Sequence, residues 1–346
     1  MHFQIPTVLS FLICIGGIAT CIPTAHAQSS GSLGGYTLGF VFDKRISALR
    51  PLSGIPGAAV LGAPVDSGGP VRRAYVASRQ NYAIALTDSG AVVIRFVPGT
   101  DPAVVTPLGI DSAAADLVAL SPNGATAALY SVNEALIRIV TGLPGAPVLA
   151  RSVPTGAVSG SIRLLAISSD AAVLIAVTHD SSSDGTSPDA VVAVDNNGNG
   201  QNLTNSTHVS ALQFAGDAHD LLLTDDSDDT LSIIQGLPDA AASKVLADSS
   251  SGISGPVGLN TSLNGNLVVA NGRAANILVL DSGGSQIGTY PCLVTPAGLT
   301  RLNGNAVFLL NVISNDDPLW LFDGDSSTPR VMFVPVEQTD PQSAGQ

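Results

Sequence analysis

Hydrophobic residues along this chain come in short runs of four to eight, separated by Gly, Asn, Asp and Ser. Residues 264–281 (NGNLVVANGRAANILVLD) show the pattern most clearly, with an Asn-Gly turn, an apolar run, a polar loop and a second apolar run. Runs of this length, bounded by residues that accept the backbone angles of tight turns, indicate β-strands rather than helices. The segment therefore predicts two strands joined by a loop.

Similar segments recur along most of the chain. Six of them lie at 72–87, 117–131, 164–178, 211–224, 257–271 and 297–311. Their shared turn positions are Ser78, Ser121, Ser168, Ala215, Ser262 and Arg301, spaced by 43, 47, 47, 47 and 39 residues. A repeat of this length, with two strands at its start, is typical of the four-stranded blades of a β-propeller. The predicted fold is all-β.

Each repeat continues into a third and a fourth predicted strand. The third strands lie at 91–96, 136–140, 190–194, 230–234, 277–280 and 319–322. Fourth strands follow at 104–107, 148–152, 244–247, 287–290 and 330–334. Residues 195–206 are almost wholly polar and give the weakest candidate for a fourth strand. The pattern predicts six complete blades.

Residues 36–43 and 47–54, before the first full repeat, resemble a third and a fourth strand without the first two. Either an incomplete seventh blade closes the ring, with residues 58–65 as a further strand, or six blades close it and the hairpin is an appendage. We favour seven blades, because a free hairpin with apolar Phe40, Val41 and Phe42 would leave exposed strand edges, which proteins usually cover.

Composition limits the classes of partner. The chain has 346 residues, of which 45% are hydrophobic and 12% charged, and its formal net charge is −13. Phosphate backbones are bound by clustered Lys and Arg, so this balance argues against nucleic acid and against anionic membrane surfaces.

The first 27 residues differ from the rest. An apolar run at 8–22 precedes Ala25-His26-Ala27, which fits a signal-peptide cleavage site after Ala27. We predict an exported protein, periplasmic or at the cell surface, with no transmembrane segment in the mature chain. In the alternative, Cys21 carries a lipid anchor. Residues 33–336 are expected to form one propeller domain, and 337–346 a disordered polar tail.

Two motifs in the repeats resemble a known family. VVAN at 268–271, followed by ILVLD at 277–281, resembles the bacterial surface-propeller repeat with a YVTN phrase and a V-x-V-I-D phrase. SPNG at 121–124 resembles the S-P-D-G turn of that family and of WD40-like and TolB-like propellers. The resemblance implies a propeller fold and a location outside the cytoplasm. It transfers no catalytic residues, because a scaffold defines the family.

Propeller geometry sorts the connections onto two faces. With blade strands named a to d, the a-to-b and c-to-d turns share one face, here called the turn face. The b-to-c and d-to-a connections share the other, here called the loop face. Acidic residues of the predicted b-to-c loops would gather on the loop face; they are Asp180, Asp184, Asp189, Asp225, Asp226, Asp228, Asp229, Asp316 and Asp317.

Such a set could bind a divalent cation or a cationic partner, since carboxylates are hard oxygen ligands. Alternatively, these are turn residues that keep the surface soluble. The corresponding loop at 271–276 carries Arg273 instead, which would interrupt the acidic face. That arginine could position an anion or pair with Asp228, Asp229, Asp316 or Asp317.

A calcium-loop fragment occurs at 195–200. DNNGNG matches D-x-[DN]-x-[DN]-G, with Asp195, Asn197 and Asn199 as the possible ligands. Position twelve of such a loop should be Glu and is Ser206 here, and no helical pattern flanks it. A c-to-d turn rich in Asn and Gly explains the segment equally well. Calcium is the one cofactor that the sequence suggests.

Catalytic motifs are missing from the sequence. His179, His208 and His219 are expected at strand ends or in loops, and neither a nucleophile elbow nor an H-E-x-x-H motif is present. The leading hypothesis is a secreted, non-enzymatic propeller that binds a protein, a glycan or an envelope component. The alternative is a metal-dependent hydrolase or lactonase, which would need an inner-strand Glu, whereas the mature chain has only Glu134 and Glu337.

Overall fold

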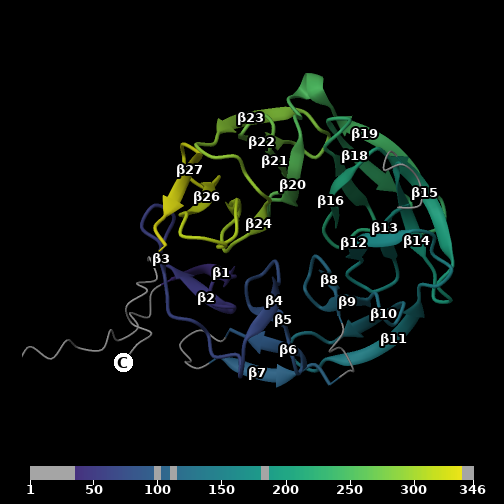
Figure 1. Cartoon of the computed structure of the whole chain (residues 1–346). Coiled ribbons are helices and arrows are strands. Elements are labelled where there is room, and N and C mark those ends of the chain that lie inside the picture. Colours follow the sequence, from purple (N-terminus) through teal and green to yellow (C-terminus); the bar gives the residue numbers. More distant parts are fainter. Residues whose placement is uncertain (1–35, 97–102, 110–114, 181–186, 337–346) are drawn as a thin grey trace, which may run out of the picture. The chain divides into compact units, whose positions relative to one another are not determined.

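The computed structural model describes residues 36–96, 103–109, 115–180 and 187–336, which fold as a β-propeller of seven blades (Figure 1). In every blade the strands pair antiparallel with their neighbours in sequence order. Six sheets have four strands, and the first has three. The prediction of seven blades with an incomplete first one is therefore confirmed.

The strands follow the chain blade by blade. Blade 1 contains β1 (Thr37–Asp43), β2 (Ala48–Ser53) and β3 (Val60–Leu61). Blade 2 contains β4 (Val71–Val76), β5 (Tyr82–Thr87), β6 (Gly90–Arg95) and β7 (Val104–Pro107). Blade 3 contains β8 (Leu117–Leu120), β9 (Thr126–Ser131), β10 (Leu136–Thr141) and β11 (Val148–Pro154). Blade 4 contains β12 (Ser161–Ile167), β13 (Leu174–His179), β14 (Asp189–Val194) and β15 (Gly200–Ser206).

The second half of the ring continues the same order. Blade 5 contains β16 (Val209–Phe214), β17 (Leu221–Asp225), β18 (Thr230–Gln235) and β19 (Ala242–Ala247). Blade 6 contains β20 (Pro256–Thr261), β21 (Leu267–Asn271), β22 (Asn276–Leu280) and β23 (Gln286–Pro291), and one 3₁₀ turn, η1 (Ser249–Ser251), precedes it. Blade 7 contains β24 (Thr300–Arg301), β25 (Val307–Leu309), β26 (Leu319–Asp323) and β27 (Arg330–Val334).

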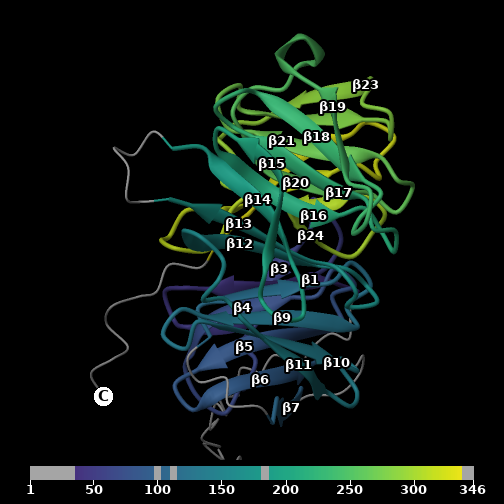
Figure 2. The ribbon, with the colours of Figure 1, turned by 90° about the vertical axis from the view of Figure 1, so that its right-hand side faces the viewer.

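Burial increases from the outermost strands to the second strands of the blades. Every residue of β5, β9, β17 and β21 is buried, because these strands are covered by blades on both sides. They consequently appear in the sequence as continuous apolar runs. The outer strands β15 and β19 lie on the outside of the ring (Figure 2) and are mostly exposed or half-buried. This explains why the polar strand β15, the weakest candidate in the sequence, is nevertheless a regular fourth strand.

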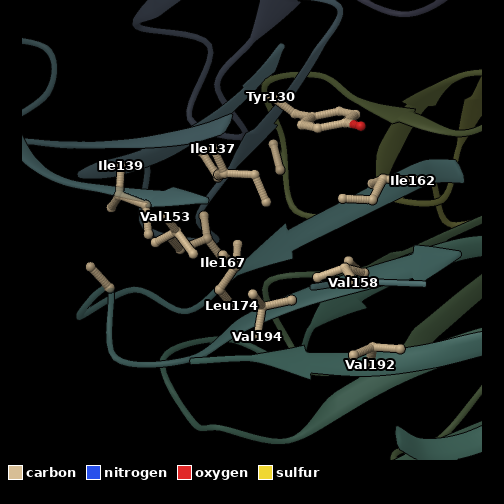
Figure 3. Close-up of a cluster of buried hydrophobic side chains, with 14 residues drawn as sticks. Tyr130, Ile137, Ile139, Val153, Val158, Ile162, Ile167, Leu174, Val192 and Val194 are labelled. Carbon is tan, nitrogen blue, oxygen red and sulfur yellow. The ribbon is translucent and has the colours of Figure 1, made fainter. Parts of the chain in front are cut away.

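Hydrophobic packing lies between blades rather than within them. Seven clusters of buried apolar side chains occur among the described residues, one at each blade interface, including the interface between blades 7 and 1. Figure 3 shows the cluster in which Tyr130 and Ile137 of blade 3 face Ile162 and Leu174 of blade 4. Each blade therefore depends on both neighbours.

Loop geometry identifies the strands of blade 1. Blades 3, 5 and 6 have four-residue b-to-c loops that end on a residue with positive φ: Ala135 (48°), Asp229 (53°) and Ala275 (48°). The loop between β1 and β2 has the same length and ends on Ser47, at 53°. Strands β1, β2 and β3 thus correspond to b, c and d, which corrects the expectation that residues 36–54 form a third and a fourth strand.

Flanking blades close the inner edge of β1, where the other blades have an a strand. The Phe40 N–H donates to Oε1 of Gln80 (2.8 Å), whose Nε2 donates to the Arg301 carbonyl of blade 7 (2.5 Å). From the turn after β24, the Asn303 N–H donates to the Leu38 carbonyl (2.7 Å). A methyl group at Gly39 would lie 2.6 Å from the nearest side-chain carbon, so this edge is tightly covered.

We expect Gln80→Ala to lower the free energy of unfolding by about 2–4 kcal/mol, because two backbone groups at the ring closure lose their partner. Alanine keeps the same positive φ of 55°, so the change reports on the side chain. Urea unfolding measures the loss. Gln201→Ala, on the exposed part of β15, is the control and should change stability by less than about 0.5 kcal/mol. Equal effects of the two substitutions would contradict the assigned role.

Candidate functional site

Two of the acidic residues predicted for the loop face are buried. Asp189, the first residue of β14, is fully buried and forms ion pairs with Arg163 and with Nδ1 of His179 (3.1 Å). Its other oxygen accepts the N–H of Val209, the first residue of blade 5 (2.7 Å). One carboxylate thereby holds three strands of blade 4 against the next blade. Asp189 is part of the framework and is not displayed by a loop, which corrects its predicted placement.

Asp225, the last residue of β17, is likewise buried. It accepts hydrogen bonds from Ser206 Oγ (2.5 Å), the His208 N–H (2.9 Å) and the Ser227 and Asp228 N–H groups (2.8 and 2.9 Å). These donors belong to the connection from blade 4 and to its own b-to-c loop. Asp225 therefore fixes two loops together, again as a framework residue.

The same strand position serves this purpose in other blades. Asn271 ends β21, is fully buried, accepts the Ser254 N–H (3.0 Å) and donates to the Gly252 carbonyl (2.9 Å). Asp43 ends β1, is fully buried and pairs with Arg45 (2.9 Å). The sequence signal for this role is a polar residue that directly follows the b-strand apolar run.

Burial alone would raise the pKa of Asp189, but the hydrogen bonds from Arg163 and Val209 outweigh it, so the pKa is lowered. Asp225 shows the same balance, in which the bonds from Ser206 and the loop N–H groups outweigh burial and lower the pKa. A carboxylate whose pKa is lowered in the folded state stabilises the fold at pH values above its pKa in the unfolded chain. This stabilisation is lost as the pH falls through its folded-state pKa.

The remaining acidic residues of the loop face are more exposed, and several have partners. Asp226 and Asp228 accept hydrogen bonds from Nδ1 of His208 (2.7 Å) and Thr207 Oγ1 (2.6 Å). The predicted pairing of Arg273 is present, with Asp229 (2.6 Å). Asp316 pairs with Arg45 (2.7 Å) and Asp317 bonds to the Asn315 amide (2.7 Å). Asp180 follows β13, and Asp184 lies outside the described residues.

Each histidine near an acidic neighbour in sequence pairs with a different carboxylate in space. His179 pairs with Asp189, and Nε2 of His219 pairs with Asp170 of the preceding blade (3.0 Å). Ser168 Oγ donates to the other oxygen of Asp170 (2.6 Å), so the carboxylate lies between serine and histidine. Histidine cannot activate the serine in this order, because a nucleophile needs the base as its direct neighbour.

The calcium-loop fragment forms a closed turn. One oxygen of Asp195 accepts the N–H groups of Asn197 and Asn199 (both 2.8 Å), and the other accepts the Asn199 side-chain amide (2.9 Å). The segment is the c-to-d turn between β14 and β15, as the second interpretation of the sequence has it. Among the described residues, no group of three or more His, Cys, Asp or Glu side chains is arranged to hold a metal ion.

A hollow of about 1110 Å³ among the described residues forms the central channel, which opens on the turn face. The inner strands β4, β8, β12, β16, β20 and β24 surround it in Figure 1. Its lining is mixed, with Leu212, Gln213 and Asn260 on the inner strands and Leu263 and Asn303 in the a-to-b turns. Blade 1 contributes none of the lining residues, because residues of its neighbours cover the edge of β1.

Sequence reasoning missed this channel mouth, although a signal was present. The a-to-b turns align the repeats in the sequence, but their residues differ from blade to blade. Ser78-Arg79 in one blade, for example, corresponds to Ser262-Leu263 in another. Leu263 is 73% exposed at the mouth, where the rim is otherwise mostly polar. Variable side chains on uniform turns are typical of a binding surface carried on a rigid scaffold.

Cys292 is half-buried, and burial raises its pKa to about 11, so its sulfur stays an unreactive thiol at neutral pH. Trp320 packs against Phe333 of the neighbouring strand, with ring centroids 5.9 Å apart. No helix in the described ranges has the length and apolar character to span a bilayer.

Comparison with known proteins establishes the fold and leaves the activity open. No protein-family model and no curated protein matches the chain. Solved propellers are similar in structure. A protein of unknown function from Desulfotomaculum acetoxidans has a TM-score of 0.56 at 12% identity, over 87% of this chain and 100% of that one.

Two further structures with related folds carry descriptions of an activity. A candidate 6-phosphogluconolactonase from Bacteroides fragilis has a TM-score of 0.53 at 12% identity, over 86% of this chain and 97% of that one. A streptogramin B lyase has a TM-score of 0.52 at 9% identity, over 78% and 85%. At such low identity these similarities support the propeller fold alone.

Asp189→Asn should lower the free energy of unfolding at neutral pH by about 3 kcal/mol, because it leaves the Arg163 charge without its buried partner. Urea unfolding measures the change, with Asp239→Asn in an exposed turn as the matched control. If the two substitutions have the same effect, the carboxylate does not hold the two blades together.

Acid should also destabilise the wild-type protein in a defined range. Because the pKa values of Asp43, Asp189 and Asp225 are lowered in the folded state, their stabilisation is fully present above the carboxyl pKa of the unfolded chain, about 4, and is lost as the pH falls through the lowered folded-state pKa values. Unfolding curves recorded across this range should show a smaller loss for Asp189→Asn. Parallel losses in the variant and the wild type would argue against this carboxylate as a source of the acid sensitivity.

Calcium titration calorimetry should give no heat at millimolar calcium, since both oxygens of Asp195 already accept hydrogen bonds from their own turn. Asp195→Asn provides the control. Heat that disappears in this variant would instead identify residues 195–200 as a calcium site.

Proposed function

We propose that this protein is an exported, non-enzymatic binding module whose ligand or partner contacts the turn-face mouth of the central channel. The candidate partners are those expected from the sequence: a protein, a glycan or an envelope component. The observation that carries the proposal is the mouth itself, a wide opening rimmed by side chains that differ from blade to blade, with Leu263 exposed among polar neighbours. Concave surfaces with a few apolar contacts and several polar ones are the usual binding sites of proteins.

The hydrogen bonds of the acidic side chains support a binding role. Asp189 and Asp225 already accept hydrogen bonds on both oxygens and are closed off from solvent. On the turn face, Asp170 lies between Ser168 and His219, so this histidine is not the direct neighbour that a serine nucleophile needs. No arrangement among the described side chains favours the metal-dependent hydrolase over the binding module.

Leu263→Ser tests the proposal at the mouth. Immobilised wild-type protein is incubated with culture medium and envelope extract of the native host, and retained proteins and small molecules are identified by mass spectrometry. The variant should lose the specifically retained species, because the side chain is 73% exposed and its removal costs the fold little.

Leu293→Ser is the matched control, since this leucine is 82% exposed but follows β23 on the loop face. It should retain the same species as the wild type. Loss of binding in the control, with full retention by Leu263→Ser, would move the binding surface to the loop face and overturn the proposal.

A further inference from the structure

Positive charge at the channel mouth is confined to two arginines on neighbouring sides of blade 1. Arg301 ends β24 in blade 7, and Arg79 lies in the first turn of blade 2. Both line the channel, and they are linked through one intermediate, because Gln80, next to Arg79, donates to the Arg301 carbonyl (2.5 Å). The remaining charged residues of the lining are Asp217 and Asp220 of blade 5, which lies on the opposite part of the ring.

The guanidinium of Arg301 is held in place by uncharged groups. Nη1 donates to the Thr261 carbonyl (2.7 Å) and Nη2 to the Asn305 carbonyl (3.1 Å). No carboxylate among the described residues lies within ion-pair distance, although the charge of Asp325 acts on Arg301 through space. Burial lowers the pKa of Arg301, which shows that its charge is partly removed from water.

A half-buried guanidinium oriented by carbonyls keeps further N–H donors for another acceptor. A carboxylate or phosphate binds such a fork through short charge-assisted hydrogen bonds. Arg79 adds a second, exposed charge on the same side of the mouth and has no ion pair within the described chain. Arg301 and Arg79 are the two positively charged residues of the channel lining, on either side of blade 1, in a protein of formal net charge −13.

We propose that the turn-face mouth contains an anion subsite, formed by Arg301 and Arg79, that binds the carboxylate or phosphate group of a small organic molecule. This inference rests on the proposed binding function and specifies its ligand chemistry. The body of the ligand extends over the uncharged lining, including Gln213 and Asn260. Asp217 and Asp220 repel a second anionic group on the far side, so the ligand is oriented with its charged end toward blades 7 and 2.

Arg301 could instead have a purely structural role, in which its two hydrogen bonds to carbonyl groups join β20 to the short strand β24. That role would make the residue important for stability and indifferent to anions. Arg79 separates the two interpretations, because it is exposed and its removal leaves the packing unchanged.

The test measures binding of inorganic phosphate and of citrate by calorimetry, at constant ionic strength. Arg79→Gln and Arg301→Gln should each weaken binding about tenfold. Arg301→Lys keeps the charge but not the fork and should bind citrate with intermediate affinity. Asp217→Asn should strengthen binding severalfold, because a repulsive charge is removed. Lys244→Gln, which removes one exposed positive charge on β19, is the matched control and should change affinity less than twofold.

Circular dichroism shows whether Arg301→Gln folds. If it does not fold, the anion affinity of Arg79→Gln tests the proposal alone. The proposal is overturned if the wild type binds neither probe below about 50 mM, or if Arg79→Gln and Lys244→Gln bind alike. These outcomes are separate from the Leu263→Ser experiment. Loss of captured species in Leu263→Ser without anion binding would leave the binding module intact and remove the subsite. If anion binding depends on the arginines but Leu263→Ser loses no captured species, the subsite stands and the proposed binding surface at Leu263 falls.

Discussion

Every blade of this protein is held by its two neighbours, so the fold depends on closing the ring. The seven apolar clusters of the described residues lie at the seven blade interfaces, and among these residues no blade has a separate core of its own. Burial of apolar area is the main favourable term in folding, and here it is complete only when blade 7 meets blade 1. Blade 1 is also the blade that lacks an inner strand. At the inner edge of β1, closure rests on the Gln80 side chain and on the backbone hydrogen bond from Asn303 to Leu38, in place of a fourth strand.

Buried polar groups reinforce this closure. Asp189, Asp225 and Asn271 each connect a strand end to a connection from the adjacent blade. In a low-dielectric environment an unpaired carboxylate would be costly, and these residues are accordingly surrounded by donors. Some of the acidic residues on the loop face, such as Asp189 and Asp225, therefore stabilise the fold.

The incomplete first blade also shapes the candidate site. Because the edge of β1 is covered by Gln80 and Asn303, the channel is lined from six blades only, and the two blades beside the gap supply both arginines of the mouth. The charge distribution around the channel is therefore asymmetric. An uneven mouth of this kind can orient a ligand, whereas a ring of identical blades could not.

The sequence by itself determined the all-β repeat and most strand positions, because second strands are buried on both faces and therefore read as unbroken apolar runs. It favoured seven blades over six, and the structure decided for seven. It predicted the partner of Arg273 among four candidates, and the turn at 195–200 as one of two readings. It gave only a weak candidate for β15, whose polar residues lie on the outside of the ring and are exposed or half-buried. The framework roles of Asp189 and Asp225, and the presence of Arg301 and Arg79 in the lining of one channel, were decided by tertiary structure alone. Packing of consecutive blades brings the two aspartates to their donors, whereas closure of the ring brings blades 7 and 2, which carry the arginines, to the two sides of blade 1.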